Sequence, residues 1–397
     1  MIKALRAGGL FDGTTAFGPS MVLVEDGRIK DVDTTGAQPP EGAEVVDYGA
    51  EAWILPGLID THVHLAFDAS GDPVAGLEGA ADDDVLAGMR RAAGRALEAG
   101  VTTVRDLGDR GYLALRLREE AASWPHVQPH IVAAGPPITS PGGHCHFLGT
   151  EVWGREALIA AVRERHERGC EVVKVMASGG AMTPGTSMHL PQYQAQDLRA
   201  VVEEAHRLGM TTAAHVHSSE AIVQTLDAGF DTLEHLTFFT DHGPDPDPAL
   251  VDRIAGHGAT LSLTVGRLPD EPAAGRIAQM LGRLYPAWAR LHGAGAAITA
   301  GTDAGINRAK PHDVLPYAVQ DLAGPIGMTP GEALAAVTSV AADACGLAGV
   351  KGVLKPGADA DVLVVGRDPL HDLAALRDVR SVYRAGCDID PVGLLSW

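Results

Sequence analysis

The stretch Leu55-Pro-Gly-Leu-Ile-Asp-Thr-His-Val-His64 sets a pattern that the middle of the chain repeats, an apolar strand that ends in polar side chains. His62 and His64 are two residues apart. On an extended segment, residues two apart face the same side, so both imidazole rings point to one place. Two converging imidazoles suit a divalent metal, although an isolated HxH pair also occurs by chance in loops.

Strand-like and helical stretches alternate on both sides of this segment. The strand candidates are Ala52–Asp60, Val101–Asp106, His130–Ala134, Glu171–Met176, Thr211–His215, Thr232–His235, Thr260–Val265 and Ala296–Asp303. The clearest helical stretches are Asp82–Ala99, Arg155–Arg168 and Ala195–Leu208, each followed by a glycine. Eight strands with intervening helices over about 300 residues are typical of an α/β fold of the (β/α)8 TIM-barrel type. A doubly wound open sheet is the alternative, but we find no GxGxxG motif that opens a helix after the first strand.

Both ends of the chain are rich in β-forming residues. Met21–Lys30 holds two β-rich runs around Asp26-Gly27, a pair that suits a tight hairpin turn. Asp361–Val365 and Val379–Ala385 are strand candidates near the other end. Since the termini of one folded unit often lie close together, we expect both ends to form one small β domain.

Composition and charge exclude several classes of protein. Hydrophobic residues make up 46% and charged residues 21% of the 397 residues, which is ordinary for a folded chain and excludes a disordered one. Asp and Glu (51) exceed Lys and Arg (31), and the net charge of −20 argues against binding to nucleic acid or anionic lipid. No apolar run is long enough for a membrane span.

The N-terminus and the cysteines bear on where the protein works. Met1–Ala16 holds Lys3, Arg6 and Asp12 among its apolar residues, which is not the core of a signal peptide, so we expect a cytoplasmic protein. The four cysteines are scattered without a CxxC motif. Such spacing favours reduced thiols over disulfides or a thiolate zinc site.

Further strand candidates also end in groups that can ligate a metal. They are Lys174 within Val172-Val-Lys-Val-Met176, His215-Val-His217, Glu234-His235, and Asp303 within Thr299-Ala-Gly-Thr-Asp303. Barrel enzymes place their chemistry at the C-terminal ends of the strands, where these side chains would meet. One such residue is usually a satisfied buried polar group, but five strand ends with ligand-type groups predict a metal site.

Lys174 stands out because it interrupts an apolar strand. Burying a lone ammonium is costly, so the group needs a partner or a changed charge. One interpretation is an ion pair with an acid across the barrel. The other is carboxylation of the amine by CO2, which turns a cation into an anionic carbamate able to bridge two metals.

Together these residues resemble the amidohydrolase superfamily in its two-metal, carboxylated-lysine form. The matching pattern is Leu55–His64, Lys174, His215, His235 and Ala300-Gly-Thr-Asp303. Gly357-Ala-Asp-Ala-Asp-Val-Leu-Val-Val365 resembles the superfamily's return into a small β-sandwich. The resemblance implies a β-sandwich domain from residues 1–55 and 357–397 and a hydrolase barrel from residues 56–356.

Two motifs narrow the resemblance to a branch. Pro141-Gly-Gly-His-Cys-His146 and Ala214-His-Val-His217 resemble the imidazolonepropionase-like branch. This branch holds metal-dependent Xaa-Pro dipeptidases, related carboxypeptidases and ochratoxin-type amidases. It implies a small-molecule substrate with a peptide or N-acyl amino acid amide bond, and an assembly larger than a monomer.

The resemblance also implies roles for the ligand-type residues. His62, His64 and Asp303 would hold one zinc ion, and His215 and His235 the other, with carboxylated Lys174 and a hydroxide between them. Mn²⁺, Co²⁺ or Fe²⁺ also suit such ligands. The bridging hydroxide would attack the amide carbonyl while Asp303 carries the proton to the leaving amine.

Three residues are candidates for substrate binding. His144 lies with His146 in a glycine-rich loop, and Tyr193 follows the long loop Ala177–Gln192. Resemblance to the dipeptidase branch implies that His144 and Tyr193 bind a substrate carboxylate; a solvated loop and a packing aromatic are the plain alternatives. His217 faces the same way as His215 if the strand stays extended, so it is a candidate contact to ligand or substrate.

Other functions stay open at this stage. His217-Ser-Ser-Glu220 has the HxxE spacing of one-metal deaminases and cyclic-amide hydrolases, although an acid such as Glu220 also suits the start of a helix. Lactones and phosphotriesters are opened by similar centres. A barrel kept as a binding or scaffold protein is the non-enzymatic alternative.

Overall fold

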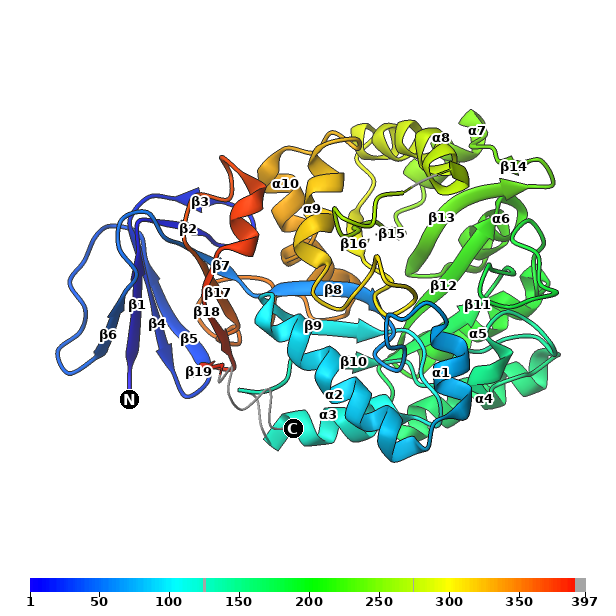
Figure 1. Cartoon of the computed structure of the whole chain (residues 1–397), viewed down its shortest axis with the longest axis horizontal. Helices are drawn as coiled ribbons and strands as arrows, with labels where there is room; N and C mark the ends of the chain where they lie inside the picture. The colour runs from blue at the N-terminus through cyan, green and yellow to red at the C-terminus, as the bar shows by residue number, and fades with distance from the viewer. Residues whose placement is uncertain (124–125, 274, 390–397) are drawn as a thin grey trace.

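The computed structural model describes residues 1–123, 126–273 and 275–389. Two parts lie side by side in Figure 1, with strands of the N-terminal segment at one end and a larger α/β part at the other. The last residues of the predicted C-terminal segment, 390–397, lie outside the described residues. No helix in the described ranges is long and apolar enough to cross a membrane.

Eight parallel strands form the centre of the larger part. They are β8 (Leu58–Val63), β9 (Val101–Asp106), β10 (His130–Ala133), β11 (Val172–Met176), β12 (Thr211–Ser218), β13 (Thr232–Thr240), β15 (Thr260–Thr264) and β16 (Ile298–Gly301). One sheet has the order β10-β9-β8 and the other β11-β12-β13-β15-β16, where the short β14 (Gly243–Pro244) also pairs with β13. Single parallel bridges connect the two sheets, from Ile138 to Val175 at one seam and from Val63 to Ala304 at the other. The predicted alternation of parallel strands and helices is therefore confirmed.

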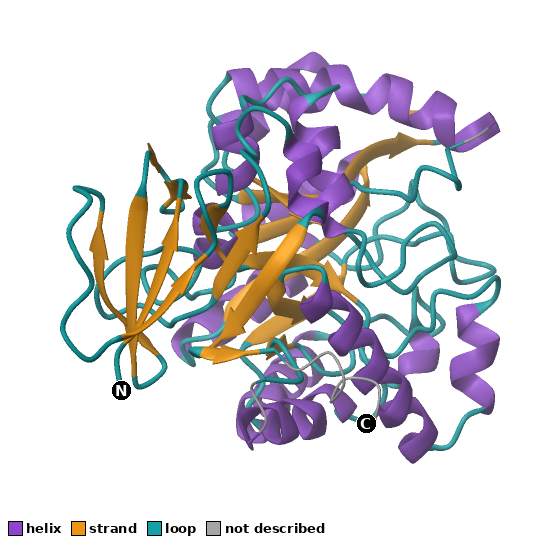
Figure 2. Ribbon diagram, turned by 60° about the vertical axis from the view of Figure 1, so that its left-hand side comes forward, coloured by secondary structure: helices purple, strands orange, loops and turns teal. Residues whose placement is uncertain are grey.

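Helices cover the outside of these strands (Figure 2). They are α1 (Pro73–Gly79), α2 (Asp82–Glu98), α3 (Leu113–Ser123), α4 (Arg155–Arg168), α5 (Ala195–Arg207), α6 (Ser219–Ala228), α7 (Pro248–Ala255), α8 (Gly275–Gly293), α9 (Leu315–Ala323), α10 (Pro330–Ala335) and α11 (Ser339–Ala344), with 3-10 turns η1 (His146–Leu148) and η2 (Leu373–Arg377). The predicted glycine stop is clearest at α4, where Gly169 adopts φ +87° and its N–H bonds the carbonyls of Arg165 and His166.

Strands from both ends of the chain pair with one another in the smaller part. One sheet has the order β5-β4-β1-β6 and the other β19-β18-β17-β7-β2-β3. Their bounds are β1 (Lys3–Ala7), β2 (Gly9–Phe11), β3 (Ala16–Phe17), β4 (Ser20–Glu25), β5 (Arg28–Asp33), β6 (Glu44–Asp47), β7 (Trp53–Pro56), β17 (Val362–Val365), β18 (Val379–Arg384) and β19 (Cys387–Asp388). β7 and β17 are antiparallel neighbours. Asp26 and Gly27 both have positive φ in the tight turn between β4 and β5, as their sequence predicts.

One predicted boundary is wrong. The candidate strand Ala52–Asp60 is two strands, because β7 ends at Pro56 in the smaller part and β8 begins at Leu58 among the parallel strands. Gly57 lies between them, and a Cβ there would approach the Thr102 hydroxyl oxygen to 2.1 Å. The chain therefore passes close against β9 at a point where only glycine fits.

The side chains of the two terminal sheets share one apolar core. Leu5, Val22, Ile54 and Val364 are each fully buried in it and come from four different strands. Apolar area removed from water is the main source of stability for such a unit, since its hydrogen bonds exchange with those to water.

Ile54→Ala is expected to lower the free energy of unfolding by about 2–5 kcal/mol, because it leaves a cavity between the two sheets. Urea unfolding followed by circular dichroism measures the change. Val45→Ala is the matched control, since Val45 is 46% exposed, and should stay within about 0.5 kcal/mol of the parent. Equal effects of both substitutions would contradict a shared core at Ile54.

Candidate metal centre

The predicted ligands at the strand ends converge in two groups. The first group is His62, His64 and Asp303, whose ligand atoms all lie within 4.8 Å of one another. The Nε2 atoms of His62 and His64 lie 3.6 and 3.4 Å from Asp303 Oδ1. His62 lies near the end of β8 and His64 directly follows the strand, so the spacing of the HxH motif accounts for their shared direction.

The orientation of His62 is fixed from behind by a buried carboxylate. Glu234 Oε2 lies 2.9 Å from His62 Nδ1, and the same carboxylate accepts bonds from Arg105 at 3.0 Å and Thr232 at 2.8 Å. Burial opposes ionisation of Glu234, but Arg105 and His62 hold its pKa down at about 2. With Nδ1–H donated to this anion, the Nε2 of His62 is left to face Asp303.

His64 and Asp303 are also held by the backbone. His64 Nδ1 lies 3.0 Å from the Gly108 carbonyl, so it donates its proton there and leaves Nε2 free. Asp303 has φ +58° and donates its backbone N–H to the His62 carbonyl at 2.7 Å. A non-glycine residue rarely adopts this conformation, and here it turns the carboxylate toward the histidines. His62, His64 and Lys310 favour the ionised carboxylate and lower the Asp303 pKa, although burial opposes them.

The second group is His215, His217 and His235, and its ligand atoms also lie within 4.8 Å of one another. The rings of His215 and His217 are 4.4 Å apart between centroids, as expected for residues two apart on β12. Thr237 and Thr264 hydroxyls lie 2.7 and 3.0 Å from the Nδ1 atoms of His217 and His235. The ring of His235 is 5.0 Å from that of His62, so the two groups are adjacent.

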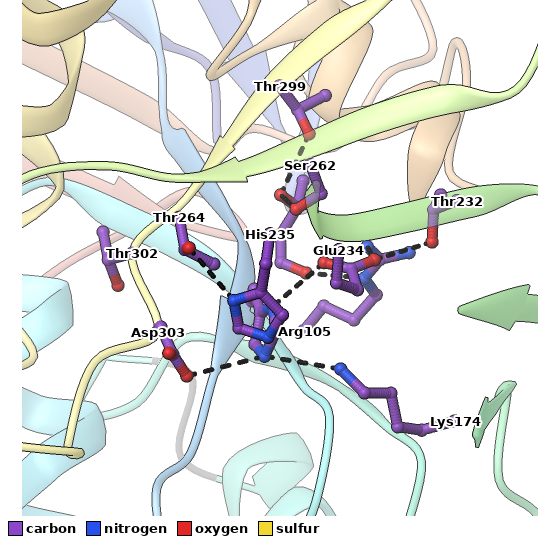
Figure 3. Close-up of polar contacts among 12 residues, drawn as sticks. Arg105, Lys174, Thr232, Glu234, His235, Ser262, Thr264, Thr299, Thr302 and Asp303 are labelled. Carbon is purple, nitrogen blue, oxygen red and sulfur yellow. Dashed lines mark hydrogen bonds and ion pairs between the residues drawn. The ribbon is translucent and has the colours of Figure 1, made fainter. Parts of the chain in front are cut away.

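Lys174, on β11, contacts the first group, and its charge also acts on His215 and His235 of the second. Its Nζ is 3.5 Å from His62 Nε2, the same atom that lies 3.6 Å from Asp303 Oδ1. In Figure 3 the side chains of Lys174 and Asp303 point toward one another. No carboxylate in the described part of the chain forms an ion pair with it, which does not favour the interpretation of a lysine paired with an acid. Burial lowers the pKa of Lys174 to about 8, although Glu234 and Asp303 favour the ammonium.

His144 borders the second group, whereas the hydroxyl of Tyr193 is used elsewhere. The ring of His144 is 4.6 Å from that of His215, and its Nδ1 lies 3.0 Å from the Thr183 hydroxyl. Tyr193 is buried, and its hydroxyl donates to the Val152 carbonyl at 3.0 Å. Its ring stacks on Trp153. The structure thus supports a packing role for Tyr193 and gives no support to its predicted contact with a substrate carboxylate.

The glutamate of the HxxE spacing points away from the centre. Glu220 lies in the first turn of α6, as an acid at a helix start should. It is exposed, and its carboxylate accepts a bond from Gln224. His217 therefore belongs to the second group, whereas Glu220, three residues later, does not.

The donor set fits divalent metals. Imidazole nitrogens and a carboxylate oxygen are the ligands that Zn²⁺ and the neighbouring transition metals accept. All six residues of the two groups are buried, and the hydroxyl, carbonyl and carboxylate partners described above orient the ligand nitrogens. Lys174 lies nearby and forms no ion pair with a described carboxylate, so carboxylation of its amine could add a further anionic ligand.

From the sequence we named Glu234 among the polar groups at strand ends but did not predict that it orients His62, and we did not name Arg105. Arg105 and Glu234 are 129 residues apart in the chain, and nothing local connects them. The available indication was a charged residue inside each of two apolar strands, since a buried charge needs a partner. Thr237, Thr264 and the Gly108 carbonyl gave no indication of their own.

Known proteins resemble this chain over most of its length. A model of the amidohydrolase family matches residues 53–387. The chain is 30% identical over 403 residues to an uncharacterized protein of Mycobacterium tuberculosis, with 98% of this chain and 95% of that protein covered. It is 26% identical over 373 residues to ochratoxinase of Aspergillus niger, with 83% and 73% covered. A crystal structure of a Xaa-Pro dipeptidase with bound methionine shares the fold, with a TM-score of 0.84 at 24% identity over 98% of this chain and 100% of that one.

The metal-free protein is expected to lose stability in mild acid. Burial lowers the pKa of His62 and of His217 from an ordinary 6.5 to about 4. Between these values the unfolded chain binds more protons than the folded chain, so the free energy of unfolding falls as the pH drops from about 6.5 toward 4. Urea unfolding of metal-free protein across this range measures the slope.

His217→Asn removes one of these titrating groups and should flatten that slope. His64 works in the opposite direction, because Asp303 keeps its pKa raised although burial opposes this, and so do four aspartates whose pKa values are raised by burial: Asp60, Asp106, Asp109 and Asp321. Seven histidines with lowered pKa values outnumber these five groups: His62, His130, His144, His215, His217, His235 and His312. A free energy of unfolding that stays constant with pH in the parent protein would contradict the neutral, buried histidines.

Proposed function

The chain belongs to the amidohydrolase family, and from that premise we propose that it is a two-metal hydrolase that cleaves the amide bond of a dipeptide or an N-acyl amino acid. The observation that carries this proposal is the presence of two adjacent groups of buried ligand-type side chains with the Lys174 amine beside them. A hydrolase acting on C–N bonds is the activity of the family, and the number of metals and the substrate are the proposed parts.

In this proposal His62, His64 and Asp303 hold one metal and His215 and His235 the other, with zinc as the first choice. As a carbamate, Lys174 would supply a further anionic ligand: its neutral amine nitrogen would bond the carbon of CO2 and release one proton to solvent. Bound metals of this kind polarise a carbonyl and lower the pKa of water. His217 completes the second group or contacts the substrate.

Asp303 suits the transfer of a proton during amide cleavage. Its carboxylate is ionised, buried and next to both imidazoles of the first group. It would accept a proton from the attacking water and deliver it to the nitrogen of the leaving amine. The water oxygen then stays with the acyl carbon, so the products are a carboxylate and an amine.

A substrate carboxylate suits the side of the second group. The carboxylate of the ligand cluster, Asp303, belongs to the first group, and the second group consists of three histidines. His144 adds a fourth imidazole beside His215. An anion therefore meets less repulsion on this side, and His144 and His217 are the imidazoles there that the metal assignment leaves to donate a hydrogen bond. The names of the relatives, an ochratoxinase and a Xaa-Pro dipeptidase, support an amide substrate of this kind.

The alternative is a one-metal deaminase or cyclic-amide hydrolase that uses Glu220 as its proton carrier. The exposed position of Glu220 in α6 favours the two-metal proposal over it. Metal analysis separates the possibilities: two metals per chain support the proposal, one supports the alternative, and none supports a binding or scaffold protein. A screen of dipeptides and N-acyl amino acids with the loaded protein, followed by product identification, then tests the substrate class.

Three features of the assembly belong to the same proposal. The bridges at the two seams support closure of the eight parallel strands into one barrel. The common core of the terminal sheets supports a β-sandwich domain from residues 1–55 and 357–397 beside a barrel of residues 56–356. Resemblance to the family supports a homo-oligomer, which light scattering would distinguish from a monomer of 41.2 kDa.

Lys174→Ala is expected to lower kcat/KM by about 100-fold or more, because changes around metal ligands alone typically cost up to about 100-fold. Short carboxylic acids added to this variant should restore part of the activity by supplying the missing anion. Steady-state kinetics with and without propionate measures both effects. A well-resolved structure with full metal occupancy and an unmodified Lys174 ammonium would refute the carbamate.

His144→Asn is expected to raise KM for an acidic substrate more than for its methyl ester, because only the carboxylate loses a partner. A several-fold difference between the two KM ratios is the expected size. Tyr193→Phe is the matched control, since the Tyr193 hydroxyl is bonded to Val152, and should affect both substrates equally. If Tyr193→Phe changed the KM values of acid and ester unequally while His144→Asn did not, Tyr193 and not His144 would bind the carboxylate.

A further inference from the structure

A second buried lysine lies behind the ligand cluster, in the segment that follows β16. Lys310 is 7% exposed. Its carbonyl accepts a bond from Gly305 N–H at 2.8 Å, and its own N–H donates to the Asn307 carbonyl at 3.0 Å. These bonds close the loop after Asp303, so the backbone fixes where the Lys310 side chain starts.

The ammonium of Lys310 joins the ends of two neighbouring strands. Its Nζ donates to the Thr302 carbonyl at 2.6 Å, just after β16, and to the Thr264 carbonyl at 3.3 Å, at the end of β15. It forms no ion pair among the residues that the structure describes. A compact ammonium with three donors suits two backbone carbonyls better than a planar guanidinium does.

Each of these two threonines supports one ligand. The Thr264 hydroxyl lies 3.0 Å from His235 Nδ1, in the second group. Thr302 directly precedes Asp303, in the first group, and its amide and hydroxyl both donate to Asp60, at 2.9 and 2.6 Å. Figure 3 shows Thr264 beside His235 and Thr302 beside Asp303. Thr302 is therefore held by β8 on one side and by Lys310 on the other.

We infer that Lys310 is a positioning residue that sets the spacing between the two ligand groups. It acts on His235 through Thr264 and on Asp303 through Thr302, and it touches neither ligand by a hydrogen bond. The effect of this spacing on metal binding rests on the proposed two-metal function, but the spacing itself is a property of the metal-free chain. Without the ammonium, the ends of β15 and β16 would lose the link between the Thr264 and Thr302 carbonyls.

The test compares Lys310→Met, which keeps the length of the side chain without its charge, with the parent protein. Zinc affinity of each protein, measured by competition with a chromophoric chelator, should fall by about 10–100-fold in the variant, the usual effect of removing a group that orients ligands. Substitution with Co²⁺ gives a spectroscopic readout, because magnetic coupling in a Co²⁺ pair depends on the metal spacing and should weaken. Lys310→Arg keeps the charge and should recover part of the affinity.

Lys351→Met is the matched control. Lys351 is also buried, but it pairs with Asp359 and Asp361 at 2.8 and 2.5 Å, away from the ligands. It should lower Tm without changing zinc affinity or Co²⁺ coupling. If Lys310→Met lowers Tm in the same way and keeps both metal readouts of the parent, Lys310 is merely structural and the inference is wrong.

A crystal structure of metal-free Lys310→Met separates this inference from the proposed function. The expected result is a lost Thr264–His235 contact or a displaced Asp303 carboxylate, whether or not the parent binds two metals. An unchanged arrangement of His235 and Asp303 would overturn the positioning role. A parent that binds a single metal or none contradicts the proposed function, and the metal-free geometry still decides about Lys310.

Discussion

The buried ion pair between Arg105 and Glu234 is the interaction on which the centre depends. Both side chains are fully buried, and the pair lies 3.0 Å apart. Arg105 also donates to the carbonyls of Thr61 and Ala344, so one guanidinium connects β9, β8, β13 and the end of α11. Removing one member would leave an uncompensated charge, which costs far more than the pair itself contributes. The pair is therefore better understood as fixing an arrangement than as adding stability.

The ion pair orients the first ligand group through its contact with His62. The Glu234 carboxylate takes the Nδ1 proton, so the tautomer of the ring and the direction of Nε2 are set before any metal binds. Two of the ligand-type residues, Asp303 and His235, are held in strained backbone conformations. Asp303 and His235 have φ of +58° and +70°, a conformation that costs of order 1–3 kcal/mol at a non-glycine residue. Such outliers persist where surrounding contacts hold them, and here they turn one ligand of each group into the cluster.

From the sequence we could name the ligand-type residues that the structure brings together, but not the residues that orient them, for a physical reason. A ligand-type residue is recognisable because a polar group within or at the end of an apolar strand is unusual, as at Lys174 in the middle of β11 or His215 near the end of β12. Its support is a partner from another strand, and which strands are neighbours is known only once the fold is known. Tyr193 is the opposite case. Its place after a long loop suggested a contact with a substrate carboxylate, but its hydroxyl donates to the backbone carbonyl of Val152. The break at Gly57 was missed because apolar residues continue across it, and periodicity does not reveal where a chain leaves one sheet for another.

The ionisable groups of the centre are compatible with folding because their neighbours on the same strands are apolar and buried. Val172, Val173 and Val175 around Lys174 are fully buried, as are the alanines before His215. β11 and β12 thus pack apolar side chains on either side of Lys174 and before His215. Keeping these histidines neutral and Lys174 unpaired lowers the stability of the metal-free chain. A metal that binds the folded chain alone stabilises it by mass action, so loading the site would offset the cost that the site creates. The residues that destabilise the metal-free chain would then be the ones through which a bound metal stabilises it.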